Sequence, residues 1–312
     1  MVHDWVLSAQ GDDLAMPREA VSPLNAVLFG GCMLRQPLRA MATRQRGLAD
    51  QKYGSASAKH TFGEMFQFIE VLRGARRIPR ELMSLCRISP RVGPVAGAED
   101  FHDLDVALIE PASPVELTFR GFAINRIGLN KMLASIEAEG REVAKLSALW
   151  LRVGLTGLNE DVRATTAAKL LAHVRGDTEQ ADLTRAVISE TRAFKCDMTD
   201  GFRRMQESLG CPIGAVIYVF RYLPDGRPIS WPAGFRNEVV AAAQELNLPI
   251  FDPAPLVAEH GVQVAMSDDS QHYRTRFLPV VGRALMAFTH EVHRGRAPDS
   301  RRWRDETNRA GG

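Results

Sequence analysis

Short apolar runs recur along the chain, and polar or glycine-rich residues follow each of them. Four runs predict buried strands: NAVLFGG (25–31), LDVALIEPAS (104–113), IGAVIYVFRY (213–222) and LPIFDP (248–253). Continuous apolar runs of this kind are typical of parallel strands that are covered on both faces. Helical patterns lie between them, so the sequence predicts an α/β fold, with a parallel sheet between two layers of helices.

Apolar residues at helical spacing predict the covering helices. One such stretch is GFRNEVVAAAQELN (234–247), and the closing helix is RFLPVVGRALMAFTHEVH (276–293). A further helix is predicted over 61–74, where Thr61 and Glu64 have the spacing of a capping box.

The stretch from about 123 to 210 differs from the rest because it is rich in helix formers and poor in strand signals. A crossover between parallel strands needs about a dozen residues, and this one is several times longer. We therefore expect one α/β domain over 1–312, with 123–210 as a helical insertion that serves as a lid or a dimer surface.

Composition narrows the class of protein. The 312 residues are 45% hydrophobic, and 39 Lys and Arg against 37 Asp and Glu leave a net charge of +2, too small a field to indicate nucleic acid as the partner. The tail HRGRAPDSRRWRDETNRAGG (293–312) is locally basic and is expected to be a solvated terminus. No run approaches the roughly 20 apolar residues of a membrane span, and residues 1–20 lack the apolar core of a signal peptide.

The four cysteines are widely spaced, without a pair or a neighbouring histidine at the spacing of zinc ligands. We expect no metal, free thiols and a cytoplasmic location. Cys86, Cys196 and Cys211 are expected to be small apolar fillers.

Cys32 has a different setting, in VLFGGCMLRQP (27–37). It follows the first predicted strand, where the chain would enter the helix that begins MLRQPLRAM. Ligands bind beyond the carboxyl ends of parallel strands, and amides at a helix N-terminus stabilise both a thiolate and an oxyanion. Gly30 and Gly31 would allow a tight turn. The alternative is a buried structural cysteine.

A second cluster lies immediately before the closing helix, in MSDDSQHYRTRF (266–277). Asp269 stands three residues before His272, a spacing at which a carboxylate can accept the Nδ1 proton and leave Nε2 as a base. A nucleophile near the first strand and this pair near the last helix together form one arrangement of a hydrolytic triad. The alternative is a surface histidine.

These blocks resemble those of the SGNH, or GDSL-like, hydrolase superfamily, in the divergent branches with Gly-x-Cys in place of Gly-Asp-Ser. Gly30 to Met33 match the first block and Asp269 with His272 the last; Arg35 completes a Gly-x-Cys-x-x-Arg pattern found in uncharacterised bacterial proteins. Similar blocks occur in predicted acyltransferases of capsule polysaccharide synthesis. The resemblance covers about 200 residues and implies a three-layer α/β/α domain with a flavodoxin-like sheet.

The chain departs from the family in its middle blocks, which supply a glycine amide and an asparagine side chain to the oxyanion hole. After the second strand, EPASP replaces the expected Gly-x-Asn-Asp, so Glu110 and Ser113 occupy that neighbourhood. Gly74 and Gly93 are both candidates for the other block. These departures, with Cys in place of Ser, argue against efficient ester hydrolysis and leave open acyl transfer through a thioester and a binding role.

Several further residues are candidates for ligand binding, each with a purely structural alternative. Arg35 could hold a carboxylate or phosphate, or could be a plain surface arginine. Arg221, at the end of the third strand, and Glu110, at the end of the second, are candidates for contact with a ligand. His60 is interpreted as a loop or capping histidine.

The resemblance implies an esterase or acyltransferase that acts on an ester of a carbohydrate or a related hydroxylated metabolite. Cys32 would attack the acyl carbonyl, His272 would move the proton, Asp269 would orient His272, and amides around Gly31 and Cys32 would hold the oxyanion. No resident cofactor is implied, although a transferase would need an acyl donor such as acetyl-CoA as co-substrate. The competing hypothesis is a catalytically silent binding or assembly protein. The sequence leaves the oligomeric state open.

Overall fold

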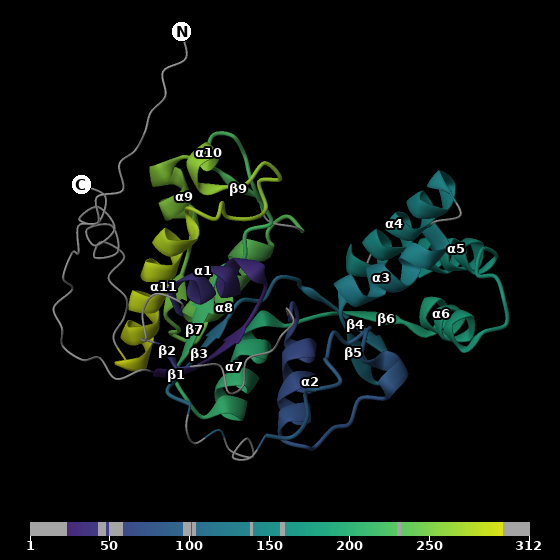
Figure 1. The fold of residues 1–312 in the computed structure, drawn as a ribbon, viewed down its shortest axis with the longest axis horizontal. Coiled ribbons are helices and arrows are strands. Elements are labelled where there is room, and N and C mark those ends of the chain that lie inside the picture. Colours follow the sequence, from purple (N-terminus) through teal and green to yellow (C-terminus); the bar gives the residue numbers. More distant parts are fainter. Residues whose placement is uncertain are drawn as a thin grey trace, which may run out of the picture.

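A computed structural model describes residues 24–42, 48–49, 59–95, 101, 104–137, 140–156, 160–229 and 232–295. The expectations for residues 1–20 and for the basic tail beyond Gly295 lie outside the described residues. The described part comprises an α/β sandwich, which carries the termini of the described chain, and a lobe of helices beside it (Figure 1).

The central sheet is parallel throughout and has the order β2-β1-β3-β7-β10. Its strands are β1 (Leu24–Phe29), β2 (Leu48–Ala49), β3 (Val106–Ile109), β7 (Ile213–Val216) and β10 (Ile250–Phe251). This order, 2-1-3-4-5 among the parallel strands, is the flavodoxin-like one. The four predicted strands are therefore confirmed, and they are neighbours in the sheet. Every residue of β3 and β7 is buried, as continuous apolar runs predict.

Helices cover both faces of this sheet. One face packs against α1 (Cys32–Ala42), α9 (Ala254–His260), α10 (Val262–Ala265) and α11 (Leu278–His293). The other face packs against α2 (Phe62–Leu72), α7 (Met198–Leu209) and α8 (Phe235–Glu245). The predicted three-layer α/β/α architecture is confirmed. None of the described helices is both long and apolar enough to cross a membrane.

The predicted capping box forms at the start of α2, with a modification. The Thr61 side chain accepts a hydrogen bond from the Glu64 amide at 3.3 Å, as an N-cap does. The Glu64 carboxylate accepts a hydrogen bond at 3.2 Å from the amide of His60, the residue before the N-cap, and not from the amide of Thr61 itself. The cap therefore fixes the backbone of His60 as well as the helix end.

Helices α1 and α11 approach closely at Gly282. A Cβ atom there would lie 2.6 Å from the carbonyl oxygen of Pro37, which is backbone and cannot rotate away. We expect Gly282→Ala to destabilise the protein by about 1–3 kcal/mol through overpacking. Urea unfolding measures this change. Gly93→Ala is the matched control, because a Cβ at Gly93 meets nothing within 4 Å; equal stability of the two variants would contradict the prediction.

Between β3 and α7 the chain builds the second lobe (Figure 1). A three-stranded antiparallel sheet has the order β5-β4-β6, from β4 (Val115–Phe119), β5 (Phe122–Ile124) and β6 (Arg192–Lys195). Its helices are α3 (Arg126–Glu137), α4 (Arg141–Thr156), α5 (Glu160–Leu171) and α6 (Glu179–Glu190). Helix α7 falls within the stretch 123–210 but packs against α8 in the sandwich. The role of this stretch as a lid or dimer surface stays a prediction.

The third predicted strand is shorter than its apolar run. Strand β7 ends at Val216, and the chain continues into a small hairpin of β8 (Arg221–Tyr222) and β9 (Pro228–Ile229). The backbone explains the break: the Phe220 amide donates to the Ile229 carbonyl, and the Tyr222 amide donates to that of Ser270. The latter bond ties the hairpin to the segment that carries Asp269 and His272.

Candidate active site

The turn from β1 into α1 places Cys32 at the carboxyl edge of the sheet. Strand β1 ends at Phe29, and Cys32 is the first residue of α1, one residue before the start of the predicted helix at Met33. Glycine is required at position 30, because a Cβ there would lie 2.6 Å from Cβ of Glu110 and 2.8 Å from its Oε2. The side chain of Glu110 thus fills the space that a larger residue in the turn would need.

Glu110, directly after β3, is a buried carboxyl group that caps α1 from the neighbouring strand. Its Oε2 accepts the Gly31 amide at 2.6 Å, and it also accepts the Leu34 amide. Burial nevertheless raises the pKa of Glu110 to about 8. The Gly31 amide, expected to bind an oxyanion, is engaged by Glu110 and does not point to an empty position.

Cys32 is half-buried, and its sulfur lies against the amides of Cys32 and Met33. Burial raises the pKa of the thiol, the negative charge of Glu110 raises it further, and the two amides lower it. The resting sulfur is therefore a protonated thiol, and its use as a nucleophile requires a base.

We expect Glu110→Gln to lower the pKa of the Cys32 thiol. Glu110 has a pKa of about 8, so above that pH it is charged and opposes ionisation of the sulfur; glutamine removes this charge and keeps an acceptor for the Gly31 amide. The pH dependence of iodoacetamide labelling at Cys32 measures the shift. Glu116→Gln is the control, since its carboxylate is not among the charges acting on Cys32. A thiol pKa that stays equal or rises in Glu110→Gln would contradict the prediction.

Asp269 and His272 form the pair that their spacing predicts. His272 Nδ1 lies 2.6 Å from Asp269 Oδ2, while Oδ1 of Asp269 accepts from the Ser267 hydroxyl at 2.6 Å and from the Gln271 amide at 2.8 Å. These bonds, that of Ser267 foremost, hold the pKa of Asp269 well below its usual range. The carboxylate is thus fixed by one oxygen and, with the other, orients the imidazole of His272 through Nδ1.

The segments that carry the first and last blocks pack into the same apolar cluster on one face of the sheet. The charge of Asp269 contributes to the raised pKa of the Cys32 thiol. The buried side chain of Tyr273, next to His272, interacts electrostatically with both Glu110 and Cys32. The segment 266–273 therefore lies within electrostatic range of the elbow, the turn of residues 30–32 that carries Cys32.

The structure adds three residues to this edge: His60, Arg126 and Tyr218. Tyr218 follows β7 and interacts with Glu110, Cys32 and Arg126; burial raises its pKa to about 12. Arg126 begins α3 and interacts with both Tyr218 and His60. His60 Nε2 lies 4.0 Å from the position that a Cβ on Gly31 would take. Sequence reasoning missed this grouping because the three residues come from separate elements.

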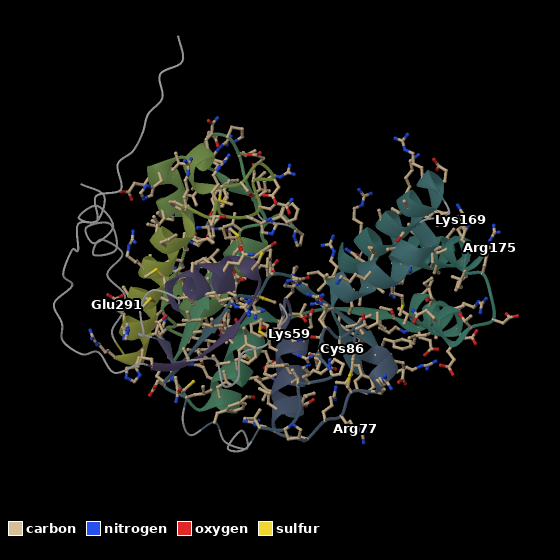
Figure 2. All side chains as sticks on the ribbon, viewed as in Figure 1. Lys59, Arg77, Cys86, Lys169, Arg175 and Glu291 are labelled. Atoms are coloured by element: carbon tan, nitrogen blue, oxygen red, sulfur yellow. The ribbon has the colours of Figure 1, made fainter. Side chains whose placement is uncertain are left out.

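A buried polar cluster supports the segment that carries His60. Lys59 Nζ donates hydrogen bonds to the carbonyl oxygens of Cys86 (3.2 Å) and Arg87 (2.9 Å). Figure 2 labels Lys59 and Cys86 in the region between the sandwich and the helical lobe. Glu64 accepts from Asn125 Nδ2 at 2.5 Å, and its charge interacts with Lys59. Because Asn125 immediately precedes α3, the cluster also joins the base of the helical lobe to the active-site edge.

The remaining predicted site residues take different positions. Arg35 is 8% exposed; among the described residues its Nη2 has no hydrogen-bond partner, and burial lowers its pKa to about 10. Its charge interacts with Cys32, so it belongs to this edge and is not a plain surface arginine. The Ser113 hydroxyl bonds to the amide and carbonyl of Val115 and stabilises its own loop. Arg221 is exposed in the hairpin β8, beyond the end of β7.

The other thiols are held protonated by burial, which raises the pKa of Cys86 to about 11 and those of Cys196 and Cys211 to about 12.

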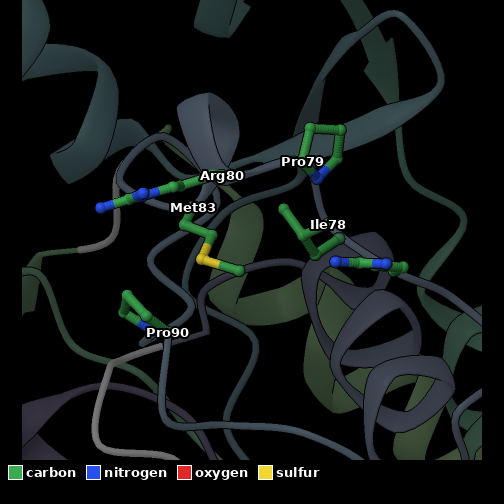
Figure 3. Close-up of a pocket in the computed structure, with 6 residues that line it drawn as sticks. Ile78, Pro79, Arg80, Met83 and Pro90 are labelled. Atoms are coloured by element: carbon green, nitrogen blue, oxygen red, sulfur yellow. The ribbon is translucent and has the colours of Figure 1, made fainter.

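A surface pocket at the turn η1 (Arg80–Leu82) contains none of the predicted site residues (Figure 3). Its lining is Arg77, Ile78, Pro79, Arg80, Met83 and Pro90. In the described part of the chain, no three His, Cys, Asp or Glu side chains are grouped as metal ligands.

Comparison with protein families gives one finding. The family described as the TviD N-terminal domain matches residues 24–288, which include every residue of the site above. Neither a curated protein nor a solved structure matches the chain.

Proposed function

Because this chain belongs to the TviD N-terminal domain family, which is linked to Vi capsular polysaccharide biosynthesis, we propose that it is an SGNH-like acyltransferase or esterase that uses Cys32, His272 and Asp269. The observation that carries the proposal is that the charge of Asp269, whose carboxylate also binds Nδ1 of His272, acts on the Cys32 thiol at the carboxyl edge of a flavodoxin-like sheet. The family context favours a carbohydrate hydroxyl as the acyl acceptor. An acyl donor, such as acetyl-CoA, would be a co-substrate.

The proposed reaction follows from the state of each group. His272 Nε2 takes the proton of the Cys32 thiol, and the sulfur attacks the acyl carbonyl carbon. A C–S bond forms while the π pair of the carbonyl moves to its oxygen. When that pair returns, the bond to the leaving group breaks, and the leaving group takes the proton from His272. In the second half, an acceptor hydroxyl gives its proton to His272 and attacks the thioester carbonyl; the C–S bond breaks, and the released Cys32 sulfur takes the proton back from His272.

The raised pKa of the Cys32 thiol fits this role for His272. A sulfur that is protonated at rest needs a base at the moment of attack. Asp269 holds Nδ1, so the proton can be taken only at Nε2.

Arg35 fits the proposal as a cation beside the sulfur. Its buried guanidinium, with Nη2 lacking a partner among the described residues, can bind an anionic group of the donor or acceptor. Glu110, by contrast, holds the elbow in place through the Gly31 and Leu34 amides.

Trapping of an acyl-enzyme tests the proposal. The protein is mixed with p-nitrophenyl acetate, quenched in acid within seconds and analysed by peptide mass spectrometry. We expect acetylation at Cys32 alone, and acetylated sugar in place of free acetate when methyl glycosides are added. Absence of acetyl-Cys32 at all times would contradict the proposal.

One observation favours the second candidate, a silent binding protein. Burial and Glu110 both oppose ionisation of Cys32. On that alternative, iodoacetamide would label Cys32 no faster than Cys211, another half-buried thiol. On the catalytic proposal, Cys32 is labelled faster, and His272→Ala removes the difference.

A further inference from the structure

Among the described residues of this site, two groups that could donate a hydrogen bond to a reacting carbonyl are engaged elsewhere. The Gly31 amide donates to Glu110, and the Ser113 hydroxyl bonds within its own loop. Glu110 itself stands where the SGNH resemblance would place an asparagine donor. A carbonyl attacked by Cys32 develops negative charge on its oxygen, and hydrogen-bond donors aimed at that oxygen are a large part of catalysis.

His60 is placed to fill this gap. Its Nε2 lies beside Gly31, at 4.0 Å from the position of a Cβ atom there. Its backbone is fixed on three sides: the amide donates to Glu64, and the carbonyl accepts from the amides of Ala112 at 2.9 Å and Ser113 at 3.2 Å. The side chain is therefore presented to the elbow from a rigid segment, as a pre-organised donor must be.

The surroundings give His60 and His272 opposite properties. His272 has the carboxylate of Asp269 on Nδ1, which suits a base that becomes positively charged during the reaction. The charges acting on His60 are all positive, from Arg126, Lys59 and Arg87. Burial first, and these cations next, lower its pKa to about 4, so the ring is neutral at pH 7 and carries one N–H. A neutral imidazole in such a setting polarises a carbonyl and does not exchange its proton.

We propose that His60 is the oxyanion donor of this site: its Nε2–H binds the oxygen of the acyl group that Cys32 attacks. The inference rests on the proposed function and adds a catalytic residue to it. His60 donates a hydrogen bond and keeps its proton throughout, while His272 carries the proton between Cys32 and the leaving group.

Two reactions of Cys32 separate this role from others. Acylation by p-nitrophenyl acetate creates an oxyanion, and alkylation by iodoacetamide does not. We expect His60→Ala to slow the release of p-nitrophenolate by about 10²- to 10³-fold, with little change in KM and with the rate of alkylation unchanged. His60→Gln, which retains an N–H donor at a similar reach, is expected to recover at least about tenfold of the loss. His173→Ala, at a half-buried histidine after α5, is the control.

Each other outcome is decisive. If His60→Ala loses alkylation and acylation in parallel, His60 has a structural role or acts as a base, and the inference is overturned. An unchanged rate of acylation in His60→Ala also overturns it. So does a His60→Gln variant that is as slow as His60→Ala. If His60→Ala does not fold, as judged by circular dichroism, the two reaction rates of His60→Gln and His60→Asn decide by the same criterion. If the wild-type protein shows no acylation dependent on Cys32, the proposed function itself fails, which is a separate result.

Discussion

Cys32→Ala is expected to lower the rate of p-nitrophenolate release from p-nitrophenyl acetate by at least about 10⁴-fold. Alanine has no nucleophilic atom and cannot form the thioester. The neighbouring chain should fold as before, since among the described residues the hydrogen bonds to the sulfur come from the amides of Cys32 and Met33 at the start of α1. Stopped-flow absorbance measures the release, and circular dichroism checks the fold.

Cys211→Ala is the matched control for this variant. Cys211 is also half-buried, and burial likewise raises its pKa, but it precedes β7 at the opposite end of the strand from the active-site edge. It should retain wild-type turnover. Turnover that survives in Cys32→Ala and falls in Cys211→Ala would place the nucleophile elsewhere.

Asp269→Asn is expected to lower turnover by about 10⁴-fold while the segment keeps its conformation. The two carboxylate oxygens have separate tasks: Oδ1 accepts from Ser267, Gln271 and the His272 amide, and Oδ2 faces His272 Nδ1. Asparagine can keep Oδ1 in place. Its NH2 group then faces Nδ1 and donates to it, which moves the ring proton to Nε2, the wrong tautomer for a base.

The neighbouring carboxylate supplies the control. Asp268→Asn makes the same change in charge, but Asp268 is exposed and pairs with Arg274 at 2.8 Å. Steady-state kinetics with p-nitrophenyl acetate should show wild-type turnover for Asp268→Asn. Equal losses in the two variants would assign the effect to net charge and remove Asp269 from the proposed mechanism.

The sequence was sufficient for four strands of the central sheet, β1, β3, β7 and β10, because each lies in a continuous apolar run. It did not indicate the short strands: β2 has only two residues, and the smaller sheet begins with β4, whose alternating Val115–Phe119 pattern lies directly after the second predicted strand. The end of β7 was also misjudged. Apolar character continues past Val216, but the backbone of Phe220 and Tyr222 bonds to the hairpin and to Ser270.

The site was predictable only where its signals are local. Cys32 was indicated by its place between a strand and a helix, and the Asp269–His272 pair by its spacing. The positions of His60, Tyr218 and Arg126 depend on which elements pack together, so no local pattern shows them. The capping box of Thr61 and Glu64 was visible, yet that Glu64 would bind the amide of His60 and the side chain of Asn125 became evident only in three dimensions.

The cap that Glu110 provides for α1 has a consequence for how the protein folds while it is being synthesised. The Gly31 amide and its acceptor are separated by 79 positions in the chain. Because translation proceeds from the N-terminus, the ribosome releases the turn that carries Cys32 well before the carboxylate of Glu110 that binds it. Until β3 joins β1 during folding, we therefore expect the Cys32 thiol to be exposed to solvent and to have its ordinary pKa. Burial of the sulfur, with its raised pKa, follows only when β3 is in place.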